Sequence, residues 1–515
     1  MDTKTLRQKI LDLAIRGKLV PQDPADEPAT VLLERIRAEK RQMVKDGKLK
    51  PKDIKNDTVI FVGEDNLHYE QFPDGSIKCI EDEIPFDLPD GWAWTRLGNI
   101  FNHNTGKALN KTNKEGLLLP YITTSNLYWN RFELDNLKSM YFTDADIEKC
   151  TITKGDLLIC EGGDIGRAAI WCYDYEMRIQ NHIHRLRPYV DVNIELYYHI
   201  FYYYKLIGMI NGKGIGIQGL SSNQLHSILF PFPPLSEQHR IVAKLNEFIS
   251  FVDTIESDKA NLQATIQLAK AKILDLAIRG KLVPQDPNDE PASVLLERIR
   301  SEKEELIKHG KIKRNKRESV IFRGEDNSYY EKIGENVVCI DEEIPFEIPK
   351  GWIWCRLYNA TNIIMGSSPS GENLCNDSSY TEFHQGKIYF SKQIVSNSYQ
   401  YTKEVTKIAA AGSILLCVRA PVGEVNLTDR PLCIGRGLAA IEPLDTISEK
   451  FLFHWLQAFK ANLVSKATGT TFTAVTSDVV KKLLIPLPPL KEQTEILSQI
   501  NTVFCKLNII EKSLS

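Results

Sequence analysis

The sequence predicts an α/β protein in which two globular domains are joined by long antiparallel coiled-coil helices and related as a pseudo-twofold tandem repeat. Residues 10–40 recur at 273–303 without a gap and differ at only three of 31 positions. Apolar residues in three segments follow the alternating spacing of three and four that is typical of coiled coils. Two shorter markers recur as well: 83–97 returns at 343–357, and 231–241 returns at 486–496.

Composition indicates a folded, soluble protein of two to four domains. The chain has 515 residues, of which 43% are hydrophobic and 25% charged. We expect a cytoplasmic protein without a membrane segment, because the N-terminus is too charged for a secretory signal and no later stretch is long and apolar enough. Ten cysteines lack CxxC pairs and zinc-type spacing, so we expect neither disulfides nor a metal site. A net charge of −3 argues against a protein that coats DNA, but a chain that reads DNA through a few loops can be near neutral.

The recurring markers divide the chain into seven segments. These are the N-terminal part of a helical region at 1–40, a connecting segment at 41–83, a globular body at 84–235, a central helical spacer at 236–303, a second connecting segment at 304–343, a second body at 344–490, and a C-terminal helix at 491–515. The sequences of the two bodies are only faintly similar. The helical segments are therefore repeated almost unchanged, while the bodies between them differ.

The long helices follow from the apolar stripe. We predict one central helix from about Glu237 to Ile278, roughly 60 Å long at 1.5 Å per residue. The first sixteen residues and the C-terminal segment carry the same stripe and together form its counterpart. Gly17 and Gly280 are typical of helix C-caps. Glu27-Pro28 and Glu290-Pro291 each open a second, shorter helix, with proline in its first turn.

The entry into each long helix carries a recognisable motif. "PPLSEQHRI" at 233–241 and "PPLKEQTEI" at 488–496 share two prolines, Leu, Glu, Gln and Ile at matching positions. With this motif and the duplicated layout, the chain resembles, over essentially its whole length, the specificity (S) subunit of type I restriction-modification systems. One departure is the pair of insertions after the spacer helices, at 18–82 and 281–342, which are longer than those of the shortest family members.

This resemblance implies a non-catalytic, DNA-reading chain. The two bodies would be target-recognition domains, each reading one half of a bipartite site in double-stranded DNA. Two methyltransferase (M) subunits would dock on the helices, and restriction (R) subunits would join through the complex. S-adenosylmethionine, ATP and magnesium would belong to these partners, which would supply adenine-N6 methyltransferase and ATP-dependent endonuclease activities.

Candidate residues for both kinds of contact can be named. Recognition loops need small, flexible backbone with amide, hydroxyl and cationic groups. The predicted DNA contacts are Lys107, Asn110, Lys111, Thr123, Thr124, Ser125, Asn126, Arg167 and Asn181 in the first body, and Ser368, Ser370, Lys392, Gln393, Arg419, Arg436, Thr470 and Thr471 in the second. The predicted partner contacts are Ile10, Glu237, Gln238, Ile241, Leu245, Ile273, Glu492, Gln493, Ile496 and Ile500.

The residues disfavour an enzyme. Adenine methyltransferases use a [DNS]PP[FYW] loop to hold the flipped base, whereas both Pro-Pro pairs here have apolar residues on each side. No Gly-Lys pair has the spacing of a phosphate-binding loop. His182 and His184, close in sequence to Glu161, are expected to be polar residues on a loop or strand edge. The alternative function is a coiled-coil interaction scaffold without DNA sequence specificity, and a stand-alone nuclease comes third. A neighbouring gene for an NPPF-type methyltransferase would distinguish them.

Overall fold

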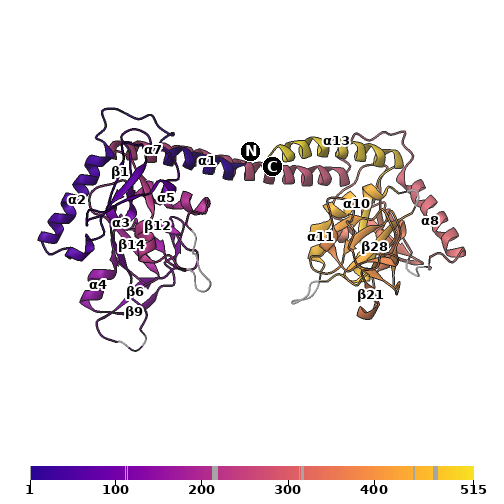
Figure 1. Cartoon of the computed structure of the whole chain (residues 1–515). Helices are drawn as coiled ribbons and strands as arrows, with labels where there is room; N and C mark the ends of the chain where they lie inside the picture. Colours follow the sequence, from indigo (N-terminus) through magenta and orange to yellow (C-terminus); the bar gives the residue numbers. More distant parts are fainter. Residues whose placement is uncertain are drawn as a thin grey trace. The chain divides into compact units, whose positions relative to one another are not determined.

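The computed structural model describes residues 2–110, 112, 114–210, 219–312, 314, 318–444, 447–467 and 474–514. The chain divides into two compact units, Met1–Asp258 and Lys259–Ser515. Each unit combines helices with a globular body built mainly of strands (Figure 1).

The predicted central helix is confirmed as α7, Leu235–Ile278. In unit 1 its first part pairs with α1, Thr3–Ile15. Arg7 donates to Asp253 over 2.6 Å, and Gln22, just beyond α1, donates to Glu237 over 3.0 Å. From residue 7 to residue 22 the sequence number rises, while the number of the contacted residue on α7 falls from 253 to 237. α1 and α7 are therefore antiparallel.

Unit 2 repeats this pairing with α13, Leu490–Leu514. Lys270 on α7 donates to Glu511 over 2.8 Å, and Gln285 donates to Glu492 over 3.1 Å. These contacts again run in opposite directions along the two helices. In both units, therefore, part of α7 pairs with a helix from a distant part of the sequence.

The ends of the repeated helices also agree with the sequence. α1 and α7 end before Gly17 and Gly280, whose φ angles of +66° and +63° are the left-handed values of a C-cap glycine. The second helices are α2, Ala29–Lys45, and α8, Ala292–Lys308. Pro28 and Pro291 are their N-cap residues, so each proline lies one position before the first turn.

The predicted apolar stripe on α7 is buried at four positions and partly buried at most of the others. Ile241, Leu245, Val252 and Ile266 are at most 3% exposed, whereas Leu262 is 41% exposed. The buried residues of the first part share a core with α1 and α5, Ile194–Leu206. The stripe therefore stabilises the units from within.

The two connecting segments contain small sheets that the sequence analysis did not predict. Each is a three-stranded antiparallel sheet, which we name insert sheet 1 and insert sheet 2. Insert sheet 1 is β1 Val59–Val62, β2 His68–Gln71 and β3 Ile77–Cys79; insert sheet 2 is β16 Ser319–Arg323, β17 Tyr329–Ile333 and β18 Asn336–Cys339. Each shares a small core with a strand pair of its body, β4 Ala93–Arg96 with β15 Leu229–Phe232, or β19 Ile353–Arg356 with β29 Leu484–Leu487.

Body 1 contains two four-stranded sheets, of order β12-β11-β14-β5 and β10-β13-β6-β9, and a β7-β8 hairpin. The strands are β5 Phe101–Thr105, β6 Leu117–Ile122, β7 Leu127–Tyr128, β8 Arg131–Phe132, β9 Lys138–Phe142, β10 Thr151–Ile152, β11 Leu157–Cys160, β12 Ala168–Ile170, β13 Met177–Ile179 and β14 Ile183–Pro188. Short helices α3 Leu97–Ile100, α4 Asp144–Cys150 and α6 Ser222–Ser227 join α5 around them. In Figure 1, β6 and β9 lie at the end of unit 1 away from α7.

Body 2 has the related sheet orders β20-β28-β25-β26 and β21-β23-β22-β27-β24. The strands are β20 Thr361–Met365, β21 Leu374–Cys375, β22 Thr381–His384, β23 Tyr401–Thr402, β24 Ile408–Ala409, β25 Ile414–Cys417, β26 Val425–Leu427, β27 Leu432–Ile434 and β28 Leu438–Pro443; the helices are α9 Leu357–Ala360, α10 Glu449–Ala458, α11 Lys460–Ser465 and α12 Ser477–Lys481. Short 3-10 turns are η1 Pro51–Asp53, η2 Glu81–Glu83, η3 Asp341–Glu343, η4 Gly371–Asn373 and η5 Lys387–Tyr389.

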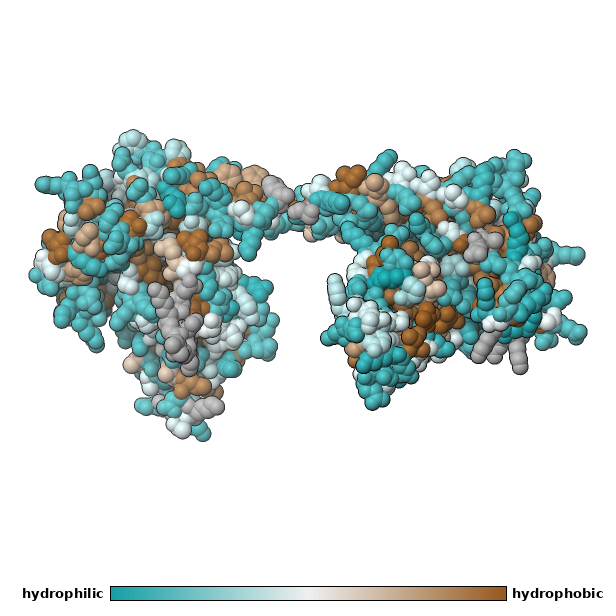
Figure 2. Space-filling model, turned by 45° about the vertical axis from the view of Figure 1, so that its right-hand side comes forward, coloured by the Kyte–Doolittle hydropathy of each residue, from teal (hydrophilic) through white to brown (hydrophobic). Residues whose placement is uncertain are grey.

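The described surface is mainly hydrophilic and carries separate hydrophobic patches (Figure 2). Among the described residues, no helix has the length and apolar character needed to cross a membrane. Within the same residues, all ten cysteines are free, and no group of three or more His, Cys, Asp or Glu side chains is arranged to hold a metal ion.

Candidate functional site

A parallel strand pair gathers polar loops in body 1. The last residues of β6 and β13, Ile122 and Ile179, lie opposite each other. Because parallel strands end at the same sheet edge, the residues that follow them emerge side by side. The chain after β5 joins them, since the Asn181 amide donates to the Lys107 carbonyl over 3.1 Å. We define the first loop edge as residues 106–107, 123–126 and 180–181.

A hydrogen-bonded turn shapes the middle of this edge. Asn126 Oδ1 accepts the Thr123 amide over 3.0 Å and the Thr123 hydroxyl over 2.7 Å. Arg167 donates to the Thr124 carbonyl over 2.7 Å, and its guanidinium lies 5.1 Å from the centre of the Tyr128 ring. Arg167 thus attaches its own loop to the first loop edge, and the structure brings these predicted residues together.

The other predicted contacts of body 1 have mixed environments. The Lys107 ammonium pairs with Asp146 over 2.6 Å and lowers the pKa of that carboxyl, so its charge already has a partner inside the body. Asn110 and Ser125 are exposed, and Lys111 lies outside the described residues.

Body 2 repeats the loop edge with different side chains. β22 and β27 run in parallel, with His384 opposite Ile434 at their ends. The Ser367 amide donates to the Ile434 carbonyl over 2.9 Å, which brings the chain after β20 to the same place. We define the second loop edge as residues 366–368, 385–386 and 435–436.

Three polar residues meet at this second edge. The Ser368 hydroxyl donates to Gln385 Oε1 over 2.8 Å and accepts the Arg436 amide over 3.3 Å. Gln385 and Arg436 are both exposed. An amide beside a guanidinium is the combination that hydrogen-bonds to adenine and guanine in the major groove. Sequence reasoning missed Gln385, because it directly follows a buried strand and no loop signal precedes it.

The remaining predicted contacts of body 2 lie on other loops. Ser370, Lys392, Gln393 and Arg419 are exposed. Among the described residues, they take no part in the hydrogen bonds given above for the second loop edge. Thr470 and Thr471 lie outside the described residues.

One glycine at each edge permits the close approach of the chain segments. A Cβ atom on Gly106 would lie 2.1 Å from the Ile179 carbonyl oxygen, and a Cβ atom on Gly366 would lie 2.1 Å from the Gly435 carbonyl oxygen. Both distances are far below contact distance, so a larger residue would move the backbone that assembles the edge.

We therefore expect Gly106→Ala and Gly366→Ala each to destabilise their unit by about 1–3 kcal/mol, the usual cost of forcing an extra methyl into a packed site. Thermal unfolding of the purified chain measures this as a lower Tm. Gly162→Ala and Gly386→Ala are matched controls, because nothing lies within 4 Å of their added Cβ atoms. Equal Tm values for tests and controls would contradict the packing argument.

The residues predicted to contact a partner are placed differently. Ile10, Ile241, Leu245, Ile496 and Ile500 are at most 8% exposed and belong to the units' own cores. Ile273 packs against the same core as α13. Because an apolar stripe is buried by the nearest complementary helix, α1 and α13 already cover these side chains. Within each unit they hold the helix pairs together, and their docking role stays a prediction.

The motif residues Glu237 and Gln238 connect α7 to the rest of unit 1. Glu237 accepts the Trp92 indole N–H over 2.9 Å and the Gln22 amide over 3.0 Å. Gln238 accepts the backbone amide of Asn193, the N-cap residue of α5, over 3.0 Å. Both side chains are at most 1% exposed, so they are internal to the unit.

Unit 2 repeats these contacts. Glu492 accepts Trp352 over 2.7 Å and Gln285 over 3.1 Å, while Gln493 accepts the Ser448 amide over 3.3 Å. Burial raises the pKa of the Glu492 carboxyl. In each unit the Glu-Gln pair therefore connects the long helix to the body and to the segment after the repeated helix. These internal contacts account for its recurrence without a contact to another protein.

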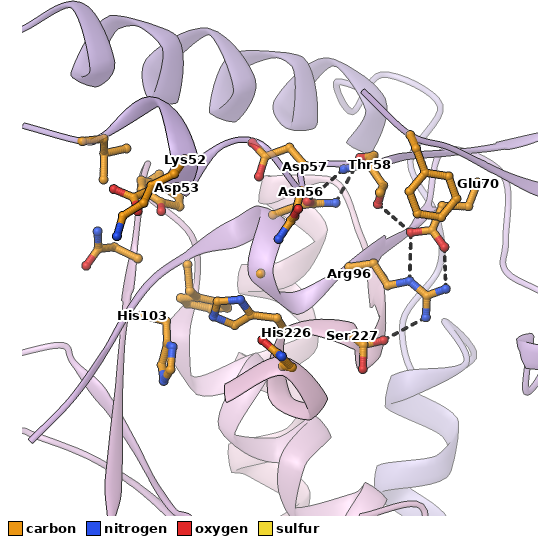
Figure 3. Close-up of a pocket in the computed structure, with 18 of the residues that line it drawn as sticks. Lys52, Asp53, Asn56, Asp57, Thr58, Glu70, Arg96, His103, His226 and Ser227 are labelled. Atoms are coloured by element: carbon orange, nitrogen blue, oxygen red, sulfur yellow. Dashed lines mark hydrogen bonds and ion pairs between the residues drawn. The ribbon is translucent and has the colours of Figure 1, made fainter. Parts of the chain in front are cut away.

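A polar pocket of about 760 Å³ in unit 1 lies where insert sheet 1 meets body 1 (Figure 3). Beside it, Arg96 binds both carboxylate oxygens of Glu70 over 3.1 and 2.6 Å and donates to the Ser227 carbonyl over 2.8 Å. Unit 2 has the same arrangement at Arg356 and Glu331. Since these charges pair with one another, this region joins the insert sheet to the body.

Histidines form a cluster at one wall of this pocket, which His103 and His226 line. His103 Nε2 lies 2.8 Å from His184 Nδ1, and His184 Nε2 lies 2.7 Å from the Leu220 carbonyl oxygen. Burial, followed by the neighbouring histidines, lowers the pKa of His103 to about 3, and burial also lowers the pKa of His184. His182 lies on a loop, 3.4 Å from Glu161. The loop position predicted for His182 is therefore found, whereas His184 is buried in β14 between β11 and β5.

Comparison with known families gives two matches along the chain. Residues 89–264 and residues 349–515 each match the family described as the type I restriction modification DNA specificity domain. Together the matches cover more than half of the chain, and each includes one loop edge.

The chain is also similar to specificity subunits of type I restriction enzymes. The type I restriction enzyme EcoAI specificity subunit of Escherichia coli is 29% identical over 98% of this chain and 89% of its own length. The EcoEI specificity subunit of Escherichia coli is 31% identical over 71% of this chain and 63% of its own length. A solved structure concerned with complex assembly and conformational transition of the type I R-M system has a similar fold, with a TM-score of 0.59, 22% identity, and coverage of 84% of this chain and 94% of that one.

Proposed function

The chain belongs to the type I restriction-modification DNA specificity family, and from this premise we propose that it is the DNA-reading subunit of a type I restriction-modification complex. Each body reads one half of a bipartite site in double-stranded DNA through its loop edge. The observation that carries this proposal is the recurrence of one edge geometry with different side chains. The two loop edges have the same backbone arrangement but carry different hydrogen-bonding side chains. Such a pair of edges suits the reading of two different half-words.

The side chains at the edges have the chemistry that base reading requires. Gln385 and Arg436 suit adenine and guanine, and Asn181 and the hydroxyl-rich 123–126 turn offer amide and hydroxyl groups. The acidic net charge of the chain leaves most phosphate contacts to partner subunits. Reading and general DNA affinity are thus divided between subunits.

Catalysis belongs to the partners. The sequence has neither a base-holding [DNS]PP[FYW] loop nor a phosphate-binding loop. We therefore assign S-adenosylmethionine, ATP and magnesium to two M subunits and to R subunits in a cytoplasmic complex. The antiparallel helices form a coiled-coil spine, and the near-identical repeats offer two equivalent docking positions to M.

Methylation-aware sequencing tests this function. The chain and its M subunit are expressed together, or M alone, in a host without other adenine methylation. We expect one bipartite adenine-methylated word with both proteins and none with M alone. Identical methylation in the two strains would overturn the assignment, and a complex that forms but methylates no defined word would favour a scaffold without sequence specificity.

A further inference from the structure

The backbone that carries Gln385 to the second loop edge is anchored by a buried ion-pair network. His384, the last residue of β22, has its Nε2 atom 2.7 Å from a carboxylate oxygen of Glu382. Arg430 donates to both oxygens of the same carboxylate, over 2.7 and 3.0 Å. Glu382 and His384 are at most 8% exposed, whereas Gln385 is exposed. Charge-assisted hydrogen bonds are strong, so Gln385 leaves the strand from a fixed position.

The side-chain amide of Gln385 is held in one orientation. The Ser368 hydroxyl has a single proton, which it donates to Gln385 Oε1 over 2.8 Å, and its oxygen accepts the Arg436 backbone N–H over 3.3 Å. Oε1 also fills the space beside the Cα atom of Gly435, since a Cβ atom on that glycine would lie 2.1 Å from it. We name the contact from Ser368 to Gln385 the serine clamp. It turns the oxygen of the amide toward the protein.

The nitrogen end of the same amide is left to bind a ligand. Among the described residues, Gln385 Nε2 donates to no other group. Its two N–H groups are donors, and the exposed guanidinium of Arg436 also consists of donors alone. The second loop edge therefore offers hydrogen-bond donors from both side chains and no free acceptor from Gln385.

This restriction changes which base Gln385 can read. Adenine presents the acceptor N7 and the donor N6 in the major groove, so a glutamine that pairs with adenine must donate and accept at once. The serine clamp occupies the accepting oxygen. A donor alone matches a carbonyl oxygen, which guanine presents as O6 and thymine as O4. We call guanine and thymine keto bases for this shared carbonyl.

Body 1 has a different residue at the position of the serine. The backbone amides of Lys107 and Ser367 each donate to the last residue of the neighbouring parallel strand, over 3.1 and 2.9 Å, so the two positions are equivalent. The next residue is Ala108 in body 1 and Ser368 in body 2. Alanine has no hydroxyl, so the serine clamp belongs to body 2 and is no part of the frame that the two bodies share.

We infer that Ser368 is a positioning residue that sets specificity: by holding the oxygen of Gln385, it makes body 2 read a keto base at one position of its half-word and discriminate against adenine. The inference rests on the proposed function, in which body 2 reads DNA through the second loop edge. It narrows what the residue type alone allows, since a glutamine with a free amide suits adenine.

Single-turnover methylation by the complex of this chain with M, on oligonucleotides with each base at each position, tests the base preference. Gln385→Ala identifies the position, because base choice relaxes there. At that position we expect the unchanged chain to require guanine or thymine, with adenine and cytosine slower by roughly 5- to 150-fold. Two analogues distinguish the keto bases: 2-aminopurine lacks the O6 of guanine, and 5-methyl-2-pyrimidinone lacks the O4 of thymine. The analogue of the required base should be slowed by a similar factor.

Three variants of the full-length chain test the clamp itself. Ser368→Ala frees the amide to turn, so methylation with adenine at this position should rise at least about fivefold relative to the keto base. Ser368→Thr is the matched control, because it keeps the hydroxyl and should keep the keto preference. Gln385→Glu offers acceptors alone, so it should prefer adenine or cytosine, whose amino groups donate.

The possible outcomes separate the clamp from the proposed function. If the unchanged chain directs M to no defined word, the proposed function fails. If a word is defined but Gln385→Ala relaxes no base, or the relaxed position requires adenine or cytosine, the clamp is wrong and the function stands. The same conclusion follows if folded Ser368→Ala keeps the keto preference, or if Ser368→Thr loses it. Circular dichroism shows whether the variants fold, and should Ser368→Ala not fold, the analogues with the unchanged chain decide.

Discussion

Replacing residues 98–230 with the matching body of another specificity subunit should change one half of the methylated DNA word completely and leave the other half unchanged. The exchanged segment begins after β4 and ends near the start of β15, so it carries the whole first loop edge. β4, insert sheet 1 and α7 keep their own residues, and β15 is exchanged only at Leu229 and Phe230. Methylation-aware sequencing of the chimera with its M subunit reads both half-words.

The reciprocal exchange of residues 358–483 is the matched control, because it should change only the other half-word. Two hydrogen bonds join the exchanged segment to residues that are kept. The backbone amide of Asn193 donates to Gln238, and Arg96 donates to the backbone carbonyl of Ser227. Donor bodies should therefore supply a free amide and a carbonyl at these positions. A folded chimera in which both half-words change would show that reading is shared between the bodies.

Arg436→Ala and Gln385→Ala should each reduce methylation of the intact word by roughly 5- to 150-fold, because one good base contact contributes about 1–3 kcal/mol of discrimination. The reduction should come with relaxed choice at one base of the half-word read by body 2. The half-word read by body 1 should not change. Single-turnover methylation of oligonucleotides with each base at each position measures both effects.

Arg298→Ala provides the comparison for these variants. Arg298 is 47% exposed on α8 and pairs with Glu290 away from the loop edge. Its loss removes one positive charge, so it reports the general effect of charge on DNA affinity. If Arg298→Ala and Arg436→Ala weaken methylation equally and at every base, Arg436 contacts phosphate and reads no base.

The helical scaffold could be predicted because its signals are local. The stripe on α7 repeats every three or four residues, and Gly17 and Gly280 mark helix ends by their own backbone preference. Whether Glu237 and Gln238 face a partner or the interior could not be predicted. Their partners, Trp92 and Asn193, are distant in sequence, so recurrence alone does not distinguish packing from docking.

The loop edges were harder to predict for the same physical reason. Thr123 and Asn181 follow strands that end at the same sheet edge only because β6 and β13 pair in parallel across more than fifty residues. Loop composition identified the 123–126 turn and Arg436, but it gave no signal for Gln385. The insert sheets were missed because apolar side chains such as Phe61, Ile77 and Phe322 are exposed on them, which removes the polar alternation that identifies a half-exposed strand.

Pairing of α1 with α7 has a consequence for biosynthesis. Arg7 and Asp253 are 246 residues apart, and at about 5–20 residues per second the ribosome needs roughly 12–50 seconds to make that length. During this time the apolar face of α1, with Ile10, Leu11, Ala14 and Ile15, lacks α7, and before α7 is made only α5 from the body can pack on it. The second part of α7 waits in the same way for α13, which follows body 2 in the sequence. Synthesis therefore makes helix pairing the final folding step in each unit, after the strands of its body are complete.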